Sequence, residues 1–551
     1  MLDISNSGLY VMDVDDGEIP PFIFTLPALC YLDLSNNQLS GHVQDFDTTT
    51  SRLKSLFLSN NALSGFIPKA FFELTSLGAL DVSSNNFTGS LDLSHFWRLH
   101  ELTMLDLSNN WLHVMDADDD NLVDISYLSE LQDIRLASCN VIRFPRFLRQ
   151  VKSISYLDLS RNKIDGNVPN WLWDKLWSFA PYLNLSHNMF TGMQLINSYI
   201  LPFSTSMEVL DLSFNRFSGR VPMPSSSGEV LEYSNNMFSS LVPNWTLYLR
   251  DTIYFSISKN NINDQLPPSI CDAILDVLDL SNNNFYGPIP SCIIENMTHT
   301  ILNLRGNNFN GTLPTDIMTT CDLQVLDLHE YNSSGETIDF DSNNYSYEPF
   351  YRYSIEFTYK GYFMTFERML TTVTLIDFSN NRLEGTIPEA LGSLLSLRIL
   401  NLSHNNFIGN IPAQLGSLTD LESLDLSCNQ LLGEIPQELT DLTFLATLNL
   451  SDNDLVGRIP QSRQFSTFGS SSFGGNPRLC GPPLSEFPCG ASPSPYTPSA
   501  QLVHRSSPNS FDVVLFLFIG LGFGVGFAAA IVVKWNRVGR WFIANARALH
   551  R

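Results

Sequence analysis

The chain is poor in basic residues. Its 551 residues include 31 Lys and Arg against 56 Asp and Glu, for a formal net charge of −25. Five of the basic residues follow Asp512 with no acid among them, so the chain up to Asp512 carries 26 basic and 56 acidic residues, a net charge of −30. Binding to phosphate groups needs clustered Lys and Arg. We therefore exclude nucleic acid as a partner.

Catalytic and cofactor motifs are missing as well. The sequence contains no G-x-S-x-G, H-E-x-x-H or P-loop pattern. The acidic run Asp116–Asn121 invites a calcium interpretation, but an EF-hand loop counted from Asp116 needs Gly and Glu where this chain has Asn121 and Tyr127. We expect a solvated acidic loop there. We predict that the protein is not an enzyme and uses no cofactor or metal.

Cysteine is too scarce for a disulfide scaffold, with eight residues in the chain. Cys480 and Cys489 lie close together near the C-terminal end, and in an oxidising compartment we expect them to pair. One disulfide among Cys271, Cys292 and Cys321 is an open alternative, since these residues fall in successive repeats. Their spacing does not fit a zinc knuckle.

What the chain has in abundance is one repeated pattern. Between Leu29 and Pro460 it contains seventeen variants of L-x-x-L-x-L-S-x-N-x-L-x-G-x-I-P, most of them 23 to 25 residues apart. The strand residue before the Ser falls at Leu34, Leu58, Val82, Leu107, Leu136, Leu159, Leu185, Leu212, Tyr233, Ile257, Leu280, Leu304, Leu328, Phe378, Leu402, Leu426 and Leu450. This period is typical of leucine-rich repeats, in which each unit buries its apolar edge only against its neighbours.

The pattern predicts an α/β solenoid. In each L-x-L strand the two apolar residues point into the stack and the residue between them faces outward, on a concave face lined by parallel strands. Such a superhelix offers a long exposed surface and no enclosed pocket. Binding is therefore the expected activity.

Two other repeated residues are interpreted as structural. The Asn that follows each strand can satisfy backbone groups of the turn and form a ladder along the stack. It occurs at Asn37, Asn61, Asn85, Asn162, Asn188, Asn215, Asn283, Asn307, Asn381, Asn405, Asn429 and Asn453, with Cys139 in its place once. The Gly of G-x-I-P permits a turn, at Gly41, Gly65, Gly166, Gly219, Gly287, Gly311, Gly385, Gly409, Gly433 and Gly457.

The repeats stop after the strand ending at Leu328, where Tyr331 replaces the Asn and no G-x-I-P follows. Four regular repeats resume near residue 373. The expected divisions are a degenerate repeat (1–28), repeats (29–328), an interruption (329–372), four repeats (373–460), a C-terminal cap (461–489), a Ser/Pro-rich linker (490–512), a transmembrane helix (513–533) and a basic cytoplasmic tail (534–551).

Residues 513–533 form the longest apolar run. They contain no charged side chain and are long enough to cross a bilayer as a helix. The basic residues after them place the tail in the cytoplasm and the repeats outside. Within the run, small residues spaced for close helix–helix packing are Gly520, Gly522, Gly524 and Gly526.

If the repeats are extracellular, nine Asn-x-Ser/Thr sequons are candidates for N-glycosylation. They are Asn86, Asn184, Asn244, Asn296, Asn310, Asn332, Asn344, Asn401 and Asn449. The first residues show no signal peptide, and Leu2 and Ile4 read as strand residues of a repeat. We expect an N-terminally truncated chain.

The consensus, best seen from Leu421 to Pro436, resembles that of plant leucine-rich-repeat receptor-like proteins, the class that includes Cf-type disease-resistance receptors. The break, the four repeats after it, the cap and the Gly-rich apolar run fit that resemblance. It implies that the break is an island with Lys-Gly near its end that takes part in ligand recognition, and that a co-receptor kinase docks on the last four repeats. The ligand-binding candidates in the island are Tyr351, Tyr353, Tyr359, Lys360, Gly361 and Tyr362.

The leading hypothesis is a receptor at the plasma membrane, without a kinase of its own. It would sense an extracellular peptide, protein or glycan ligand and signal through a receptor-kinase adaptor and a co-receptor, in plant defence. Alternatives are a developmental receptor for an endogenous peptide, a secreted-type inhibitor of cell-wall hydrolases, and a non-functional fragment of such a receptor.

Overall fold

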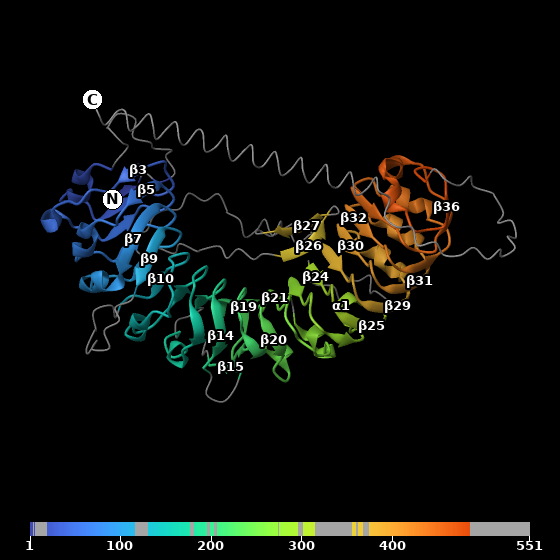
Figure 1. Ribbon diagram of the computed structural model, residues 1–551, viewed down its shortest axis with the longest axis horizontal. Helices are drawn as coiled ribbons and strands as arrows, with labels where there is room; N and C mark the ends of the chain where they lie inside the picture. The colour runs from blue at the N-terminus through green and yellow to red at the C-terminus, as the bar shows by residue number, and fades with distance from the viewer. Residues whose placement is uncertain are drawn as a thin grey trace, which may run out of the picture. The chain divides into compact units, whose positions relative to one another are not determined.

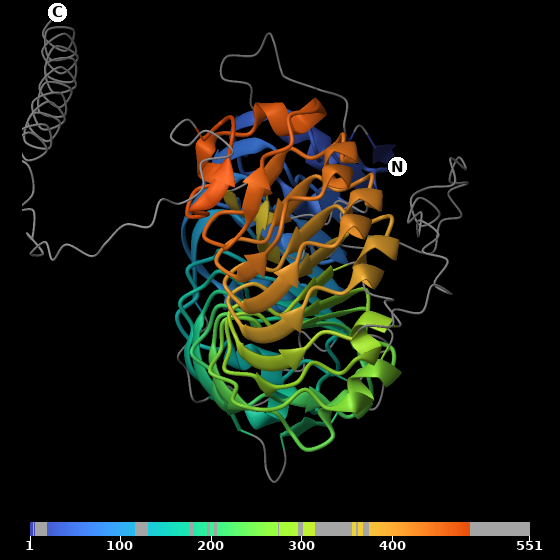
Figure 2. The same cartoon turned by 90° about the vertical axis from the view of Figure 1, so that its right-hand side faces the viewer.

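The computed structural model describes residues 1–3, 5, 19–115, 130–176, 181–194, 199–202, 207–273, 275–295, 301–314, 355–359, 362–366 and 374–484. These residues belong to one compact unit, Met1–Cys489. Figure 1 shows it coloured along the chain, and Figure 2 shows successive repeats stacked on one another with short helices along one side. The leucine-rich-repeat solenoid expected from the period is confirmed.

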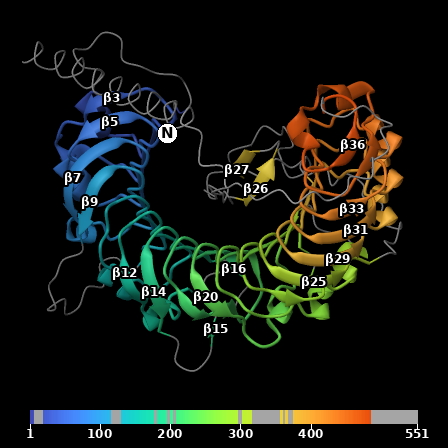
Figure 3. The same ribbon diagram turned by 45° about the vertical axis from the view of Figure 1, so that its right-hand side comes forward.

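A seventeen-stranded parallel sheet is the continuous element of the solenoid. In spatial order its strands are β1 (Leu2–Asp3), β2 (Tyr31–Asp33), β4 (Ser55–Phe57), β6 (Ala79–Asp81), β8 (Met104–Asp106), β10 (Asp133–Arg135), β11 (Tyr156–Asp158), β13 (Tyr182–Asn184), β16 (Met207–Asp211), β19 (Gly228–Glu232), β21 (Tyr254–Ser256), β22 (Val277–Asp279), β24 (Ile301–Asn303), β28 (Leu375–Asp377), β30 (Ile399–Asn401), β32 (Ser423–Asp425) and β34 (Thr447–Asn449). Figure 3 shows the curve of this unit, with the helices on its outer side.

Shorter parallel sheets follow the turn in each repeat. They comprise β3 (Ser40–His42), β5 (Ala62–Gly65), β7 (Asn86–Asp92) and β9 (Trp111–Met115); β12 (Asp165–Val168) with β14 (Met189–Met193); β15 (Ile200–Leu201) with β18 (Met223–Pro224); β17 (Ser218–Arg220) with β20 (Met237–Ser240); β23 (Tyr286–Gly287), β25 (Asn308–Thr312), β29 (Arg382–Thr386), β31 (Asn406–Asn410) and β33 (Gln430–Leu432); and β35 (Val456–Arg458) with β36 (Arg478–Cys480). The predicted glycine turns lie within these strands, except that Gly433 directly follows β33. Gly409, for example, has φ +79°, and a Cβ there would lie 2.9 Å from Thr386 Cγ2.

The helical side of the repeats is made of short 3-10 helices and one α-helix. They are η1 (Pro21–Thr25), η2 (Thr48–Thr50), η3 (Lys69–Glu73), η4 (Leu93–Arg98), η6 (Arg146–Arg149), η7 (Asn170–Leu172), η8 (Trp245–Tyr248), η9 (Pro268–Asp272), α1 (Cys292–Glu295), η11 (Glu389–Ser393), η12 (Ala413–Ser417), η13 (Gln437–Asp441), η14 (Arg463–Thr467) and η15 (Ser470–Ser472). Most of those in the repeats begin directly after a Pro, which takes the N-cap position.

One core runs the length of the stack between these layers. The inward residues of each strand are buried, as Leu400 and Leu402 illustrate with no exposed surface. A second buried position, two residues after the ladder Asn, holds phenylalanines in consecutive repeats. Their rings stack on one another, with centroids 5.9 Å apart for Phe190–Phe217 and for Phe217–Phe238. Each repeat therefore stabilises its neighbour, as expected of a solenoid.

The predicted asparagine ladder is present. Asn405 Nδ2 donates to the carbonyl of Phe378 in the preceding repeat (3.0 Å) and to those of Leu402 and Ser403 in its own (3.1 Å each), while its Oδ1 accepts from Leu383 N–H (3.1 Å). Further members that the sequence interpretation left out have the same geometry: Asn110, Asn236, Asn260 and Asn476. Cys139 Sγ contacts the Leu107 carbonyl at 3.3 Å in the corresponding position.

The interruption differs from its expected boundary. Strand β24 pairs directly with β28, so Leu302 lies beside Ile376, and no strand near Leu328 lies between them. The expectation of a thirteenth repeat ending at residue 328 is therefore wrong at this point of the sheet. Leu328 itself lies outside the described residues. The chain between β25 and β28 is described only at 313–314, 355–359, 362–366 and 374. It contains the antiparallel hairpin of β26 (Ile355–Tyr359) and β27 (Tyr362–Phe366).

Candidate ligand-binding surfaces

The concave face carries a column of mostly polar side chains, one from each strand of the large sheet from β2 to β34. Each lies between two buried strand residues, in register with the next. From β2 to β34 the concave column is Asp33, Phe57, Asp81, Asp106, Arg135, Asp158, Asn184, Asp211, Glu232, Ser256, Asp279, Asn303, Asp377, Asn401, Asp425 and Asn449. The column is strongly acidic, with Arg135 as its one cation.

Structural hydrogen bonds occupy much of this column. Asp377 Oδ1 accepts the backbone N–H of Ser379 at 2.9 Å, which closes the turn after the strand, and the other aspartates repeat this bond. From β22 onward, acids and amides alternate. Asn401 Nδ2 lies 3.5 Å from Asp377 Oδ2, and Asn449 Nδ2 lies 3.4 Å from Asp425 Oδ2. Asn303 and Asn401 therefore each separate two carboxylates that would otherwise repel each other.

Burial of these carboxylates makes ionisation costly. Desolvation, reinforced by the charge of Asp81, raises the pKa of Asp106 to about 8. Desolvation, reinforced by Asp211, likewise raises the pKa of Glu232 to about 8. Tyr254 Oη donates to Glu232 Oε2 at 2.6 Å, which opposes that rise. The negative charge of the concave face therefore increases as the pH rises through about 8, where Asp106 and Glu232 lose their protons.

The cation Arg135 interrupts the acidic column, and two aromatic rings lie beside it on the neighbouring strands. Arg135 forms an ion pair with Asp133 (2.8 Å) and lies over the ring of Tyr156, 4.2 Å from its centroid. Tyr156 in turn stacks on Tyr182 at 3.9 Å. Beside the column, a second small core contains Tyr182, Val209, Val230, Tyr254, Val277, Ile301, Leu375 and Ile399, all buried.

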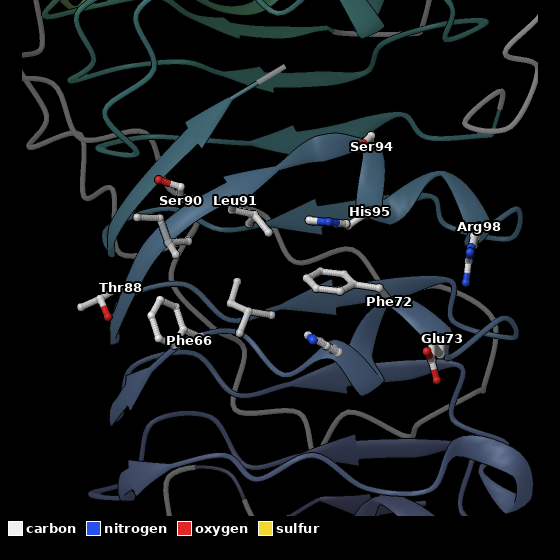
Figure 4. Close-up of a pocket in the computed structure, with 12 residues that line it drawn as sticks. Phe66, Phe72, Glu73, Thr88, Ser90, Leu91, Ser94, His95 and Arg98 are labelled. Atoms are coloured by element: carbon white, nitrogen blue, oxygen red, sulfur yellow. The ribbon is translucent and has the colours of Figure 1, made fainter. Parts of the chain in front are cut away.

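Two hollows lie on the flank of the N-terminal repeats, between the β5–β7–β9 sheet and the 3-10 helices. The larger has a volume of about 480 Å³, and its lining includes Phe66, Phe72 and Arg98 (Figure 4). The smaller, of about 190 Å³, lies next along the stack. Phe66 and Trp111 are 75% and 72% exposed. Sequence reasoning missed both residues, and their only signal is an aromatic side chain at an outward position of the repeat.

The structure separates the sequons into two groups. Asn86, Asn244 and Asn310 are exposed on the outer strands and turns. Asn184 and Asn401 are buried within the concave column, with 9% and 6% of their surface exposed, and Asn449 is half-buried there. Asn296, Asn332 and Asn344 lie outside the described residues.

Of the three cysteines Cys271, Cys292 and Cys321, the structure joins two in a disulfide. Cys271 and Cys292 form a disulfide that joins η9 to α1, with Cα atoms 6.0 Å apart. Cys321 lies outside the described residues. Cys480 is disulfide-bonded, and its expected partner Cys489 lies outside the described residues.

Other sequence predictions concern residues that the structure describes only in part. Tyr359 and Tyr362 are paired in register at the end of the β26–β27 hairpin. Tyr351, Tyr353, Lys360 and Gly361 lie outside the described residues, as do the acidic run 116–121 and the apolar run 513–533 with Gly520, Gly522, Gly524 and Gly526. Among the described residues, no helix is long and apolar enough to span a membrane, and no cluster of His, Cys, Asp or Glu is suited to a metal.

Family models for "Leucine rich repeat" match residues 51–112, and models for "Leucine Rich Repeat" match 153–174, 275–296, 372–394, 396–418 and 420–442. Receptor like protein 22 of Arabidopsis thaliana is 34% identical over 390 residues, which cover 56% of this chain and 48% of the relative. Receptor-like protein 18 of Arabidopsis thaliana is 31% identical over 296 residues, covering 49% and 34%. The chain thus spans about half the length, or less, of the relatives that it matches.

Solved structures support the same fold. The plant peptide hormone receptor RGFR1 in complex with RGF2 superposes with a TM-score of 0.55 at 21% identity, covering 84% of this chain and 77% of that one. The ectodomain of the Arabidopsis thaliana membrane receptor kinase GASSHO1/SCHENGEN3, in complex with CASPARIAN STRIP INTEGRITY FACTOR 2, gives 0.51 at 23% identity, covering 86% and 61%. At this identity the likeness concerns the fold alone.

Proposed function

Because the chain is a leucine-rich-repeat protein of the plant receptor-like kind, we propose that it is a ligand-sensing receptor at the plasma membrane. It binds an extracellular peptide, protein or glycan on its repeats and carries out no chemistry of its own. It passes the signal to a receptor-kinase adaptor and a co-receptor, and acts in plant defence.

The observation that carries this proposal is the direct pairing of β24 with β28. The ladder also crosses the junction, since Asn381 Nδ2 donates to the Leu304 carbonyl at 2.9 Å and Asn381 Oδ1 accepts from Phe309 N–H at 3.1 Å. The stack is therefore complete without the intervening segment. A segment of this size that is not needed for the stack is free to serve recognition, as long loops on rigid scaffolds commonly do.

The four repeats after the junction have a different character. Their strands β28, β30, β32 and β34 follow at a constant 24-residue spacing, and the helices η11, η12 and η13 form a regular row. Leu395 and Phe444 are 57% and 65% exposed at the surface of these repeats. Exposed apolar side chains on a regular face suit the docking of a partner protein.

A test starts with the full chain, tagged at its C-terminus and expressed in plant cells. We expect surface labelling, an endoglycosidase-dependent loss of mass, and co-purification of a receptor kinase. Cells are then exposed separately to microbial culture filtrate, cell-wall glycan fragments and endogenous secreted peptides, with kinase phosphorylation as the readout.

The matched variant replaces residues 317–371 with a short Gly/Ser linker. Because β24 and β28 already pair, it should fold and reach the surface but no longer respond. A response only to endogenous peptides would instead favour the developmental receptor. A surface-delivered chain that neither recruits a kinase nor responds would refute the receptor proposal.

A further inference from the structure

One backbone position in every repeat adopts the left-handed conformation. It immediately precedes the ladder Asn, and its φ lies between +50° and +67°. The occupants from β2 to β34 are Asn36, Asn60, Ser84, Asn109, Ser138, Arg161, His187, Phe214, Asn235, Lys259, Asn282, Gly306, Asn380, His404, Cys428 and Asp452. Most are Asn, Ser, Asp or Gly, the small and polar residues that suit the turn, with Asn, Asp and Gly the ones that tolerate this conformation best.

Four of five consecutive repeats depart from that preference. From β11 to β21 the position holds Arg161, His187, Phe214, Asn235 and Lys259. Non-glycine residues pay a cost in the left-handed region, and a bulky residue such as Phe is a genuine outlier there, whereas His adopts it more readily. Arg161 and His187 are exposed, so their side chains gain no core packing in return.

These side chains lie side by side along the stack. The His187 and Phe214 rings stack with centroids 4.1 Å apart and an interplanar angle of 9°. Partial burial and the neighbouring charge of Arg161 lower the pKa of His187. Backbone hydrogen bonds from His187 N–H to the Ser213 carbonyl (3.0 Å) and from Phe214 N–H to the Ser234 carbonyl (3.0 Å) hold the positions in register.

A second outward position, two residues further along, extends the same surface. In these repeats it holds Lys163, Met189, Arg216, Met237 and Asn261, where β14 and β20 begin (Figure 3). Met237 is 46% exposed. We call the two columns from Arg161 to Asn261 the basic ridge.

The ridge is unusual in its charge. Its ten positions contain Lys and Arg but no Asp or Glu, although the chain up to Asp512 has 26 basic and 56 acidic residues. Neither Arg161 nor Arg216 forms an ion pair with a described residue. Exposed cations, stacked rings and thioethers therefore occur together on a surface where the repeat requires none of them.

We propose that the basic ridge binds an acidic peptide segment that also carries aromatic or aliphatic side chains. Arg161 and Arg216 pair with its carboxylates, and the His187–Phe214 stack and the two methionines contact its apolar side chains. A polyanionic glycan would use the cations but leave the methionines without a role. This inference rests on the proposed function, since it names the ligand class that the repeats take.

The test measures binding of a fluorescein-labelled twelve-residue peptide of alternating Glu and Phe to the purified full chain, by fluorescence anisotropy. We expect the double variant R161E/R216E to weaken binding at least tenfold. The matched control R52E/K54E reverses two exposed cations that precede β4 and line neither hollow, and it should change affinity less than twofold. Equal loss in both variants would mean that net charge alone drives binding, and would overturn the proposal.

Phe214→Asn provides a second, independent measurement. Asn tolerates the left-handed conformation better than Phe, so this variant should unfold at a higher temperature while binding the Glu-Phe peptide more weakly. A Phe214 with a purely structural role would give lower stability or unchanged affinity. Binding of oligogalacturonate but not of the peptide would overturn the choice of occupant. Both measurements use purified protein, so they stand even where surface delivery or kinase recruitment fails.

Discussion

One side chain, Asn381, reinforces the junction across the interruption beside the β24–β28 and β25–β29 pairings. It ties the repeats before and after the interruption through its bonds to the Leu304 carbonyl and the Phe309 N–H, and Phe309 is fully buried. Asn381→Ala leaves the Phe309 N–H without a partner in a place that water does not reach, whereas the Leu304 carbonyl keeps its bond from Asn307 Nδ2 (3.1 Å). A buried unsatisfied group costs about 1–3 kcal/mol, so we expect a loss of that size at the junction.

The loss should change the mode of unfolding as well as the stability. A solenoid behaves as a row of units coupled to their neighbours, so weakening one coupling separates the row into two blocks. Urea unfolding of the full chain followed by circular dichroism should show one transition for the wild type and two for Asn381→Ala. Asn380→Gly is the matched control, because Asn380 is exposed with φ +55° and Gly accepts that conformation. A single transition with an unchanged midpoint in Asn381→Ala would refute this role for the ladder.

Three further outcomes follow from the described residues. In plant cells, Asn310→Gln should lose one endoglycosidase-sensitive mass step, whereas Asn401→Gln should lose none, because Asn401 is hydrogen-bonded within the concave column. Glu232 has a folded-state pKa of about 8 against 4.5 unfolded, so the native state keeps a proton that the unfolded chain loses, and stability falls as pH rises between those values. Glu232→Gln should therefore raise the melting temperature more at pH 8 than at pH 5. The double variant of Cys271 and Cys292 to Ser opens a loop of 21 residues and should lose about 3 kcal/mol in non-reducing urea unfolding.

The repeat itself could be predicted from the sequence because each consensus residue has one physical role. The Leu400 and Leu402 pair predicts a strand and its buried side, and Asn405 predicts the bonds that join consecutive repeats. These roles depend only on spacing. The predictions from these roles were confirmed in the repeats that contain all the consensus residues.

The thirteenth repeat shows where that reasoning failed. Leu328 ends a segment that reads as a strand, but Tyr331 stands where the Asn should be and no G-x-I-P follows. A strand pattern without these residues cannot make the ladder bonds that hold a repeat in the stack. The sheet accordingly passes from β24 to β28, and Asn381 makes the bonds that a thirteenth Asn would have made.

Outward residues were harder to predict because the consensus leaves them free. Phe66 lies against Gly89, where an added Cβ would come within 2.5 Å of the Phe66 ring, and no pattern in the sequence links the two positions. The basic ridge was missed for a similar reason. Arg161 and Phe214 carry no signal in the sequence, and they become noteworthy only once the left-handed backbone conformation at their position is known. Local conformation, more than residue type, makes these residues noteworthy.

The distribution of hydrogen bonds indicates where ligand specificity can reside in such a solenoid. In the concave column, Asp377 is 1% exposed, closes a turn with one oxygen and contacts Asn401 with the other, so its identity is fixed by the stack. Substitution there should cost stability first. On the ridge, the side chains of Arg161 and Phe214 contribute no hydrogen bond to the stack, which uses only their backbone groups, and their conformation costs stability to maintain. Changes at the ridge should therefore alter binding while preserving or improving the fold, and this opposite pairing of effects distinguishes a recognition surface from a structural one.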